Sequence, residues 1–350
     1  MQPRAANLPT PDFTYDPKTD LIAGIRPYRK DSYRLEAEQF GAKLVVHNYG
    51  HGGAGITMAL GCAHAVRDII AASGLASAGK PVAVLGGGVM GLTAATLLRE
   101  MNLSVSMYAQ DFSSTTSDRA GGQWAPSLVN HENTQAAKQR FEDILRRAFR
   151  GYEAMIGKEY GVSRRLNYTW VETSSFKKVP HDLICPPTPL ERLPFEGHAS
   201  PGFEYQTLLV EPPIFLNKLR SDLRCASVEM KQDNFKSPQQ ILDLSEPLVI
   251  NCMGLGSRRV WPDSKLVPIK GQLILLRPQP CLQYLYSGAP QGYIFPRQDK
   301  VAVGGTQEDC NEDDTPHDEM CAEIIRGHED AFNGRMSMAR LLPDWIAKYK

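Results

Sequence analysis

The chain has 350 residues, of which 42% are hydrophobic and 22% are charged, with 39 basic and 39 acidic side chains. A single hydrophobic core rarely serves so long a chain, so we expect two domains. A net charge of zero lacks the basic excess that phosphate neutralisation requires, which argues against a nucleic-acid-binding protein.

The seven cysteines are scattered and form no C-x-x-C pair, which argues against a disulfide framework and a zinc site. The first residues contain no apolar core like that of a signal peptide, and no apolar run reaches the roughly 18 residues of a membrane-spanning helix. We therefore expect a cytoplasmic protein with no bound metal and with neither a membrane nor a nucleic-acid partner. A homodimer is left open.

The first eighty residues contain a strand and a helix joined by a glycine-rich turn. Residues 1–20 are rich in Pro, Asp and Thr and read as an extended arm. An apolar strand at 43–47 leads into the turn 50–55, which opens a helix over 56–72 with apolar residues at helical spacing. Residues 73–79 have the composition of a flexible linker.

A second strand, turn and helix follow this linker. The pattern predicts a strand at 81–85, a helix over about 89–101 and a strand at 103–108. An amphipathic helix is predicted over 132–156, and residues 165–210 mix strands with proline-rich loops. Further along, the pattern predicts a helix at 212–223, strands at 247–251, 272–276, 292–295 and 301–304, and helices from about 317.

The clearest chemical signal is the turn Gly86-Gly87-Gly88-Val89-Met90-Gly91, a G-x-G-x-x-G between an apolar strand and a helix. The glycines permit a tight turn, close approach of the backbone to a pyrophosphate, and close packing of helix on strand. This context predicts a dinucleotide site. The ribose partner near the end of the next strand is Gln110 or Asp111, and the sequence does not decide between them.

A second glycine-rich turn, residues 50–55, also opens a helix. Its N–H groups and the positive end of the helix dipole stabilise negative charge, such as that of a reduced flavin. An ordinary helix entry that needs positive φ is the alternative interpretation. His47, His51 and His64 have no further ligand at a helical spacing, so we expect no metal there.

Read together, these segments resemble the D-amino acid oxidase family of FAD enzymes. The matching pieces are the glycine turn, Gly24-Ile25-Arg26-Pro27, His47-Asn48-Tyr49-Gly50-His51-Gly52-Gly53, Thr115-Thr116-Ser117-Asp118, Ala120-Gly121-Gly122-Gln123-Trp124, Thr207-Leu208-Leu209-Val210-Glu211-Pro212-Pro213, Asn251-Cys252-Met253-Gly254, Lys270-Gly271-Gln272 and Gly292-Tyr293-Ile294-Phe295-Pro296.

The order of these pieces differs from that of the family, in which the dinucleotide turn comes first and the G-x-R-P and H-N-Y-G-H-G-G segments come last. A circular permutation accounts for this, with the family order running 81–350 and then 1–80, and with 73–79 joining the old ends. Chain termini often lie close together at the surface, which permits such a rearrangement. We therefore expect Met1 and Lys350 to lie at a surface break between Trp345 and Phe13.

The resemblance implies an α/β fold with a Rossmann-like FAD-binding domain and a mixed-sheet substrate domain, in permuted order. We expect the FAD-binding domain to comprise residues 41–130 and 212–265. The substrate-binding domain would comprise residues 1–40, 131–211 and 266–350.

The resemblance also implies oxidation of a D-amino acid to the imino acid and then the 2-oxo acid, with dioxygen reduced to hydrogen peroxide. Such chemistry relies on alignment of the substrate with the flavin. Arg26 would bind the substrate carboxylate in a bidentate fork, and the Tyr293 hydroxyl would meet the same carboxylate. The backbone carbonyl of Gly53 would accept a hydrogen bond from the substrate amine.

The same resemblance places a set of residues against FAD. They are Gly86, Gly88, Val89, Met90, Gly91, Gln110 or Asp111, Thr115, Thr116, Gly121, Gly122, Gln123, Trp124, Gly254, Gly52, Gly53, Ala54, Gly55, Ile56 and Thr57.

Three departures from the family concern the substrate. Ala289 stands where vertebrate members have a second tyrosine, and Ala54 and Ala125 replace bulkier or polar residues beside the substrate. These residues predict a roomier and more apolar pocket that accepts a bulky or modified amino acid as readily as a small one. The alternative function is a related flavin amine oxidase or dehydrogenase that acts on a secondary or modified amino acid in a biosynthetic pathway.

Overall fold

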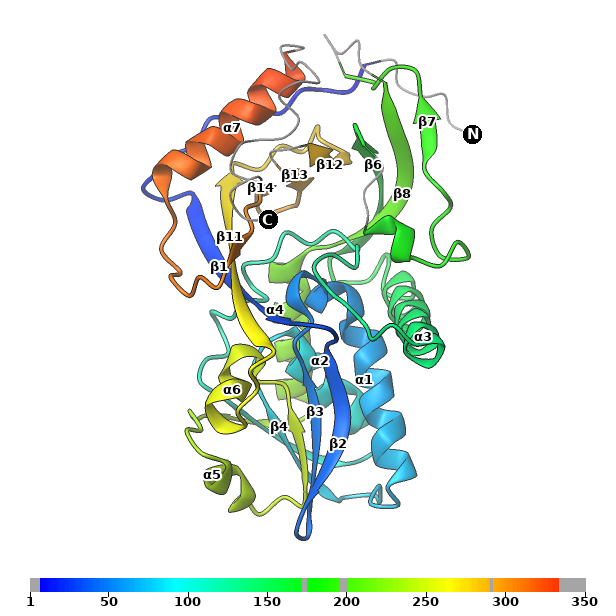
Figure 1. Cartoon of the computed structure of the whole chain (residues 1–350), viewed down its shortest axis with the longest axis vertical. Helices are drawn as coiled ribbons and strands as arrows, with labels where there is room; N and C mark the ends of the chain where they lie inside the picture. Colours follow the sequence, from blue (N-terminus) through cyan, green and yellow to red (C-terminus); the bar gives the residue numbers. More distant parts are fainter. Residues whose placement is uncertain (1–6, 172–174, 196–200, 290–291, 334–350) are drawn as a thin grey trace.

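The computed structural model describes residues 7–171, 175–195, 201–289 and 292–333. The chain forms two lobes, each built on its own sheet, and the antiparallel strands β1 (Leu21–Arg29) and β11 (Leu266–Leu276) extend between the lobes (Figure 1). The lower lobe contains a largely parallel sheet, and the upper lobe contains a mixed sheet. This is the two-sheet α/β architecture that the sequence predicts.

The lower sheet has six strands and is parallel except at one edge. Short hydrophobic strands in its centre are buried on both faces, as parallel sheets require. In spatial order the strands are β2 (Arg34–Phe40), β3 (Lys43–Tyr49), β10 (Leu248–Asn251), β4 (Pro81–Leu85), β5 (Ser104–Ala109) and β9 (Glu229–Gln232), and only β2 is antiparallel to its neighbour.

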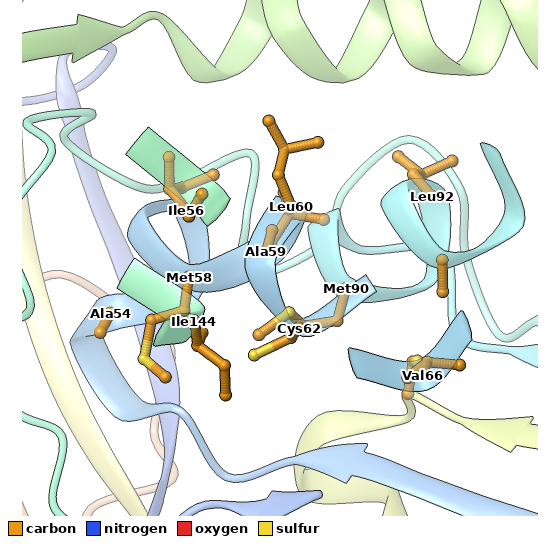
Figure 2. Close-up of a cluster of buried hydrophobic side chains, with 14 of the residues drawn as sticks. Ala54, Ile56, Met58, Ala59, Leu60, Cys62, Val66, Met90, Leu92 and Ile144 are labelled. Atoms are coloured by element: carbon orange, nitrogen blue, oxygen red, sulfur yellow. The ribbon is translucent and has the colours of Figure 1, made fainter. Parts of the chain in front are cut away.

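Helices cover both faces of this sheet. The larger layer contains α1 (Gly55–Ala72), α2 (Val89–Glu100), α3 (Gln135–Glu153) and α4 (Pro212–Cys225). The short helices α5 (Pro238–Leu242) and α6 (Ser257–Val260) pack on the opposite face. Figure 2 shows Leu60 and Cys62 of α1 and Met90 and Leu92 of α2 within the main core, which stabilises the lower lobe by removing apolar surface from water.

Helix α1 is unusually apolar. With the 3-10 turn Gly52–Ala54 before it, this segment has the length and composition of a membrane-spanning helix. The same composition is expected of a core helix, and α1 packs against both α2 and α3. Burial between these helices accounts for its apolar surface.

The upper sheet separates an aromatic core from a face that lines a cavity. Its strands lie in the order β1 (Leu21–Arg29), β11 (Leu266–Leu276), β14 (Val301–Gly304), β13 (Gly292–Pro296), β12 (Tyr284–Ala289), β6 (Val162–Thr169), β8 (Gly202–Val210) and β7 (Thr188–Leu190), and β15 (Glu308–Asp309) also pairs with β11. Helix α7 (Asp318–Phe332) covers one face, where Phe195, Tyr286 and Phe332 meet.

Two elements lie in the lower lobe, although their residue ranges were expected to belong to the substrate-binding domain. Strand β2, within residues 1–40, extends the lower sheet because its backbone pairs along its full length with β3. Helix α3, within residues 131–211, belongs to the lower lobe because Phe141, Ile144 and Leu145 are buried in the core that α1 shares. The ranges 41–130 and 212–265 do supply the other strands and helices of the lower lobe.

Residues that precede the linker lie inside the lower sheet. Strand β3 pairs with β10, which pairs in turn with β4, and α1 packs on α2. A circular permutation requires this arrangement but is not demonstrated by it, so the permutation stays a prediction. Met1, Trp345 and Lys350 lie outside the described residues.

We predict that cutting the linker 73–79 leaves the protein folded. The linker is mostly exposed, and the segments on either side are held by β3–β10 pairing and by α1–α2 packing. A protease site inserted between Ala76 and Ser77 should be cleaved with the two fragments still eluting together and still yellow with flavin. Separation of the fragments on a sizing column would show that the covalent connection is needed.

Gly61 permits the close contact between α1 and α3. A Cβ at Gly61 would meet the Ile144 backbone carbonyl well inside contact distance, whereas a Cβ at Gly151, in the same interface, would lie 2.9 Å from the movable end of Leu60. Gly61→Ala should therefore lower the free energy of unfolding by about 2 kcal/mol. Gly151→Ala should change it by less than about 1 kcal/mol, because side-chain adjustment is offset by better helix propensity. Equal urea midpoints for the two variants would contradict this.

Candidate active site

A cavity of about 700 Å³ lies between the two lobes. The parallel strands β3, β10 and β4 end at its lower side, and the face of the upper sheet opposite α7 forms its upper side. Its volume is within the roughly 300–1,000 Å³ of ligand sites, and its position at the carboxyl ends of parallel strands is where α/β folds bind ligands.

The turn 86–91 lies at the lower end of this cavity. Gly86 has φ +117°, and a side chain there would strike the Cys252 carbonyl of the neighbouring strand. Gly91 faces away from the cavity, where a side chain would strike the Gly86 carbonyl. Only glycine at these two positions allows β4 to turn directly into α2, which leaves the first amides of α2 facing the cavity for a pyrophosphate.

A polar loop is fixed against this turn. Ser117 Oγ accepts a hydrogen bond from the first amide of α2, Val89 N, at 3.0 Å. Asp118 accepts hydrogen bonds from Thr115 N and Oγ1 at 2.9 and 2.7 Å, and Arg220 of α4 reaches both Asp118 oxygens at 2.9 and 2.8 Å. This buried ion pair holds Thr115 and Thr116 at the cavity wall.

Gln110 and Asp111 both line the cavity after β5, and their side chains differ in what they bind. Hydrogen bonds from Ser113 N and Oγ, at 2.6 and 2.9 Å, engage the Asp111 carboxylate. The hydrogen bond from the Ser113 amide lowers the pKa of Asp111. Within the described part of the chain, the Gln110 side chain has no such partner, so it is the freer group for a ribose hydroxyl.

Two histidines of the H-N-Y-G-H-G-G segment are bound within the protein. His47 Nδ1 lies 3.0 Å from Asn251 Nδ2, and its Nε2 lies 3.3 Å from Glu38. His51 Nε2 lies 3.4 Å from Cys62 Sγ, and its ring stacks on Tyr33. These contacts fix the turn that brings Gly52, Gly53, Gly55 and Ile56 to the cavity at the N-terminus of α1.

Arg26 and Tyr293 meet at the upper side of the cavity. Arg26 Nη1 donates to the carbonyls of Thr306 and Lys270 at 3.0 and 3.3 Å. The guanidinium lies against Gly271, where any side chain would overlap it. Burial raises the pKa of Tyr293, and the adjacent Arg26 opposes this rise, so the Tyr293 phenol stays protonated and able to donate a hydrogen bond.

Arg26 has no carboxylate partner among the described residues. The two backbone carbonyls use Nη1, and the rest of the planar fork faces the Tyr293 hydroxyl and the cavity. A half-buried cation of this kind favours an anionic ligand, and a carboxylate matches the fork.

Most of the predicted site residues line the cavity together. They are Arg26, Gly52, Gly53, Gly55, Ile56, Gly86, Gly88, Val89, Met90, Gln110, Asp111, Thr115, Thr116, Gly121, Gly122, Gln123, Ala125, Gly254 and Tyr293.

Four predicted contact residues instead lie behind the lining, and their contact with FAD stays a prediction. Gly91 packs α2 on the turn, and Ala54 is fully buried in the core. Thr57 Oγ1 donates to the Ala125 carbonyl at 2.8 Å, which braces that segment. The Trp124 side chain is fully buried and packs edge-on against Phe149. Gln123 pairs with Leu209 of β8 in an extended segment, so the side chains of Gln123 and Trp124 point to opposite sides.

The expected roomy, apolar pocket stays a prediction. Ala125 lines the cavity, but the polar side chains of Gln123, Ser127 and Ser287 line it as well. The side chain of Ala289 lies outside the described residues. The sequence predicted no site role for Ser117 and Arg220, which fix the polar loop, or for Ser287, which lines the cavity. The available signal for Ser287 was strand alternation, which places Ser287 and Tyr286 on opposite faces of β12.

The family model DAO, described as FAD dependent oxidoreductase, matches residues 81–346. The chain belongs to this family. Its cofactor is FAD, as the glycine turn and the family resemblance predicted. The match begins at the first residue of β4, and residues 1–80 lie outside it.

Curated relatives agree with this membership. The chain is 26% identical to D-aspartate oxidase from Homo sapiens over 70% of this chain and 73% of that protein. It is 28% identical to D-amino-acid oxidase from Streptomyces coelicolor, covering 70% and 75%, and 28% identical to D-amino acid oxidase from Dugesia ryukyuensis, covering 72% and 78%.

A solved structure supports the fold of this oxidoreductase. Iminodiacetate oxidase from Chelativorans sp. BNC1 superposes with a TM-score of 0.50 at 14% identity, covering 72% of this chain and 79% of that one. At this identity the likeness concerns the fold alone.

The oxidoreductase should lose stability in mild acid through His51. Burial lowers the pKa of His51 from 6.5 to about 3, so the folded state holds the ring neutral while the unfolded chain protonates it below pH 6.5. The stabilisation is complete above pH 6.5 and is lost as pH falls toward 3. Between pH 7.5 and 5 this costs about 2 kcal/mol in the free energy of unfolding.

Urea denaturation at the two pH values measures this loss. His51→Gln should lower stability at pH 7.5 but show a pH dependence smaller by about 2 kcal/mol. His131→Gln is the matched control, because His131 is a partly exposed surface histidine. An unchanged pH dependence in His51→Gln would refute the assignment.

Proposed function

We propose that this FAD-dependent oxidoreductase oxidises a free D-amino acid with dioxygen. The substrate loses a hydride from Cα and a proton from its amine, and dioxygen takes up two electrons and two protons to give hydrogen peroxide. The imino acid then reacts with water to give the 2-oxo acid and ammonia. The observation that carries this proposal is the pairing of Arg26 with Tyr293 on a cavity that also contains the dinucleotide turn.

The residues of the cavity fit the cofactor. The N-termini of α1 and α2 both open onto it and supply amides for anionic groups of FAD, apart from the Val89 amide, which donates to Ser117 Oγ. A Cβ at Gly55 would make an ordinary van der Waals contact with the Val89 side chain at 3.8 Å, so the two helix N-termini lie close together. When bound, FAD would accept the hydride and pass the electrons to dioxygen.

The chain itself contributes binding and orientation. The free edge of the Arg26 fork would hold the substrate carboxylate, and the protonated Tyr293 hydroxyl would donate to the same group. The Gly53 carbonyl would accept from the amine. Three fixed points define the handedness of the substrate, because they set which Cα substituent faces the flavin.

Related proteins support the chemical class. Both D-amino acid oxidases and the D-aspartate oxidase carry names that specify D-amino acids, and each matches about 70% of this chain. The carboxylate site at Arg26 is the feature that any such substrate requires.

Replacing Arg26 tests this function. Arg26→Leu should lower kcat/KM for D-amino acids by about a thousandfold, because the carboxylate loses a bidentate, charge-assisted contact. Arg26→Lys should lose less, about ten- to a hundredfold, since it keeps the charge but not the fork. Peroxide release measures both, across D-, L- and N-methyl amino acids.

Two results would overturn the proposal. One is activity on L-amino acids alone. The other is full D-amino acid activity in Arg26→Leu. Retained yellow flavin absorbance in both variants separates a lost substrate contact from a lost cofactor.

A further inference from the structure

The upper sheet places its cavity-facing residues in one row. Register pairs join Tyr293 on β13 to Ser287 on β12, and Asn167 on β6 to Tyr205 on β8, while β12 and β6 are neighbours. Side chains paired across neighbouring strands share a face, and strands lie about 4.8 Å apart. The row therefore continues from Tyr293, the proposed carboxylate-binding residue, into a polar wall, which we define as Gln123, Asn167, Tyr205 and Ser287.

The hydrogen bonds in this wall have a determined direction. Asn167 Nδ2 donates to the Tyr168 carbonyl at 3.2 Å, and a carbonyl only accepts, so Asn167 Oδ1 must face the other way. Asn167 Oδ1 then accepts from Gln123 Nε2 at 3.0 Å and from Ser287 Oγ at 3.1 Å. Since the Ser287 proton is used there, the Tyr205 hydroxyl, 3.3 Å away, donates to Ser287 Oγ.

This direction decides which atoms remain for a ligand. Gln123 and Ser287 line the cavity, whereas Asn167 is fully buried behind them. Among the described residues, Gln123 Oε1 has no donor, and one of the two hydrogens on Gln123 Nε2 has no acceptor. The polar wall thus presents two acceptor oxygens, Gln123 Oε1 and Ser287 Oγ, and one N–H donor to the cavity, a combination that a carboxamide matches.

The wall carries no charge of its own. Its four side chains are two amides and two hydroxyls, and each is bonded to another member of the wall. A substrate carboxylate placed against this wall would lie beside uncharged oxygen atoms with no cation to pair with. A substrate ammonium would lose its hydration without gaining a carboxylate partner. Phe176, whose ring lies 4.1 Å from that of Tyr205, adds an apolar surface beside the wall.

We propose that the polar wall selects amino acids whose side chain is uncharged and donates a hydrogen bond, with a carboxamide as the best fit. The carboxamide N–H groups would donate to Gln123 Oε1 and Ser287 Oγ, while Arg26 and Tyr293 hold the α-carboxylate. Asn167 is a positioning residue, because it fixes both acceptors without reaching the cavity. This inference rests on the proposed oxidation of D-amino acids and names the substrate class.

Three substrates of nearly equal shape test the proposal on the holoenzyme. D-asparagine, D-leucine and D-aspartate differ in bearing a donor, an apolar group and a carboxylate. D-asparagine should have the highest kcat/KM, by about tenfold or more over each of the others, because an analogue without a donor leaves buried acceptors unpaired. Equal or better turnover of D-leucine or D-aspartate would overturn the proposal.

Variants assign the effect to the wall. Gln123→Met and Ser287→Ala should each reduce the ratio of D-asparagine to D-leucine kcat/KM about tenfold, and a ratio cancels any common effect on folding or flavin. Gln307→Met is the matched control, because Gln307 lines the same cavity outside the wall and bonds Asp309. Its ratio should match that of the unaltered enzyme. An unchanged ratio in both wall variants would remove these residues from the proposal.

A binding measurement separates this inference from the proposed reaction. Succinamate, 4-methylpentanoate and succinate are the corresponding carboxylates without an amine, and calorimetry on the holoenzyme gives their affinities without turnover. Succinamate should bind about tenfold more tightly than either. If it does so while no D-amino acid is oxidised, the reaction fails and the wall stands. If D-amino acids are oxidised but succinamate binds no more tightly than the other two carboxylates, only the selectivity proposed for the wall is refuted. If none of the three carboxylates binds and no D-amino acid is oxidised, both proposals are refuted.

Discussion

The site depends on the guanidinium of Arg26 lying flat across Gly271. This contact is possible because β1 and β11 pair in a register that sets Gly24 opposite Gly271 and Arg26 two residues further along β1. A side chain at residue 271 would occupy the position of the guanidinium itself. The same ladder adds β1 to the edge of the upper sheet beside β11, so one backbone register both extends the sheet and places the Arg26 guanidinium at the cavity.

The two lobes contribute different kinds of chemistry for a structural reason. Parallel strands end at one edge, where glycine turns and helix N-termini expose backbone amides suited to phosphate and to a flavin. The strands of the mixed upper sheet instead alternate their side chains between its two faces, which leaves one face for the α7 core and the other for the proposed substrate. Asn251 links the halves of the lower edge, since it contacts His47 on β3 and accepts from Met253 N and Ser257 Oγ in the turn after β10. These hydrogen bonds hold β3 and the turn after β10, which are far apart in the chain, together at the lower side of the cavity.

Local signals explain what could be predicted from the sequence. The strand at 81–85, the helix from residue 89 and the helix from residue 212 are defined by apolar spacing, glycine and proline within a few residues, and the structure confirms them. The lobe to which β2 and α3 belong depends on partners far away in the chain, such as β3 and α1, which no short pattern records. Trp124 shows the same limit, because its motif was visible but the direction of its side chain is set by pairing of its loop with β8.

The character of the substrate pocket follows from hydrogen-bond direction rather than from residue size. Small residues at 54 and 125 suggested an apolar space, yet Ala54 is buried in the core and Gln123 lines the cavity. Whether an amide such as Gln123 presents a donor or an acceptor depends on its partner, and that partner, Asn167, is oriented by one backbone carbonyl on β6. The polarity of the wall is thus decided at Tyr168, a residue whose own ring packs on the opposite face of the sheet. A substitution that reversed the Asn167 amide would exchange acceptors for donors at the cavity without altering its shape.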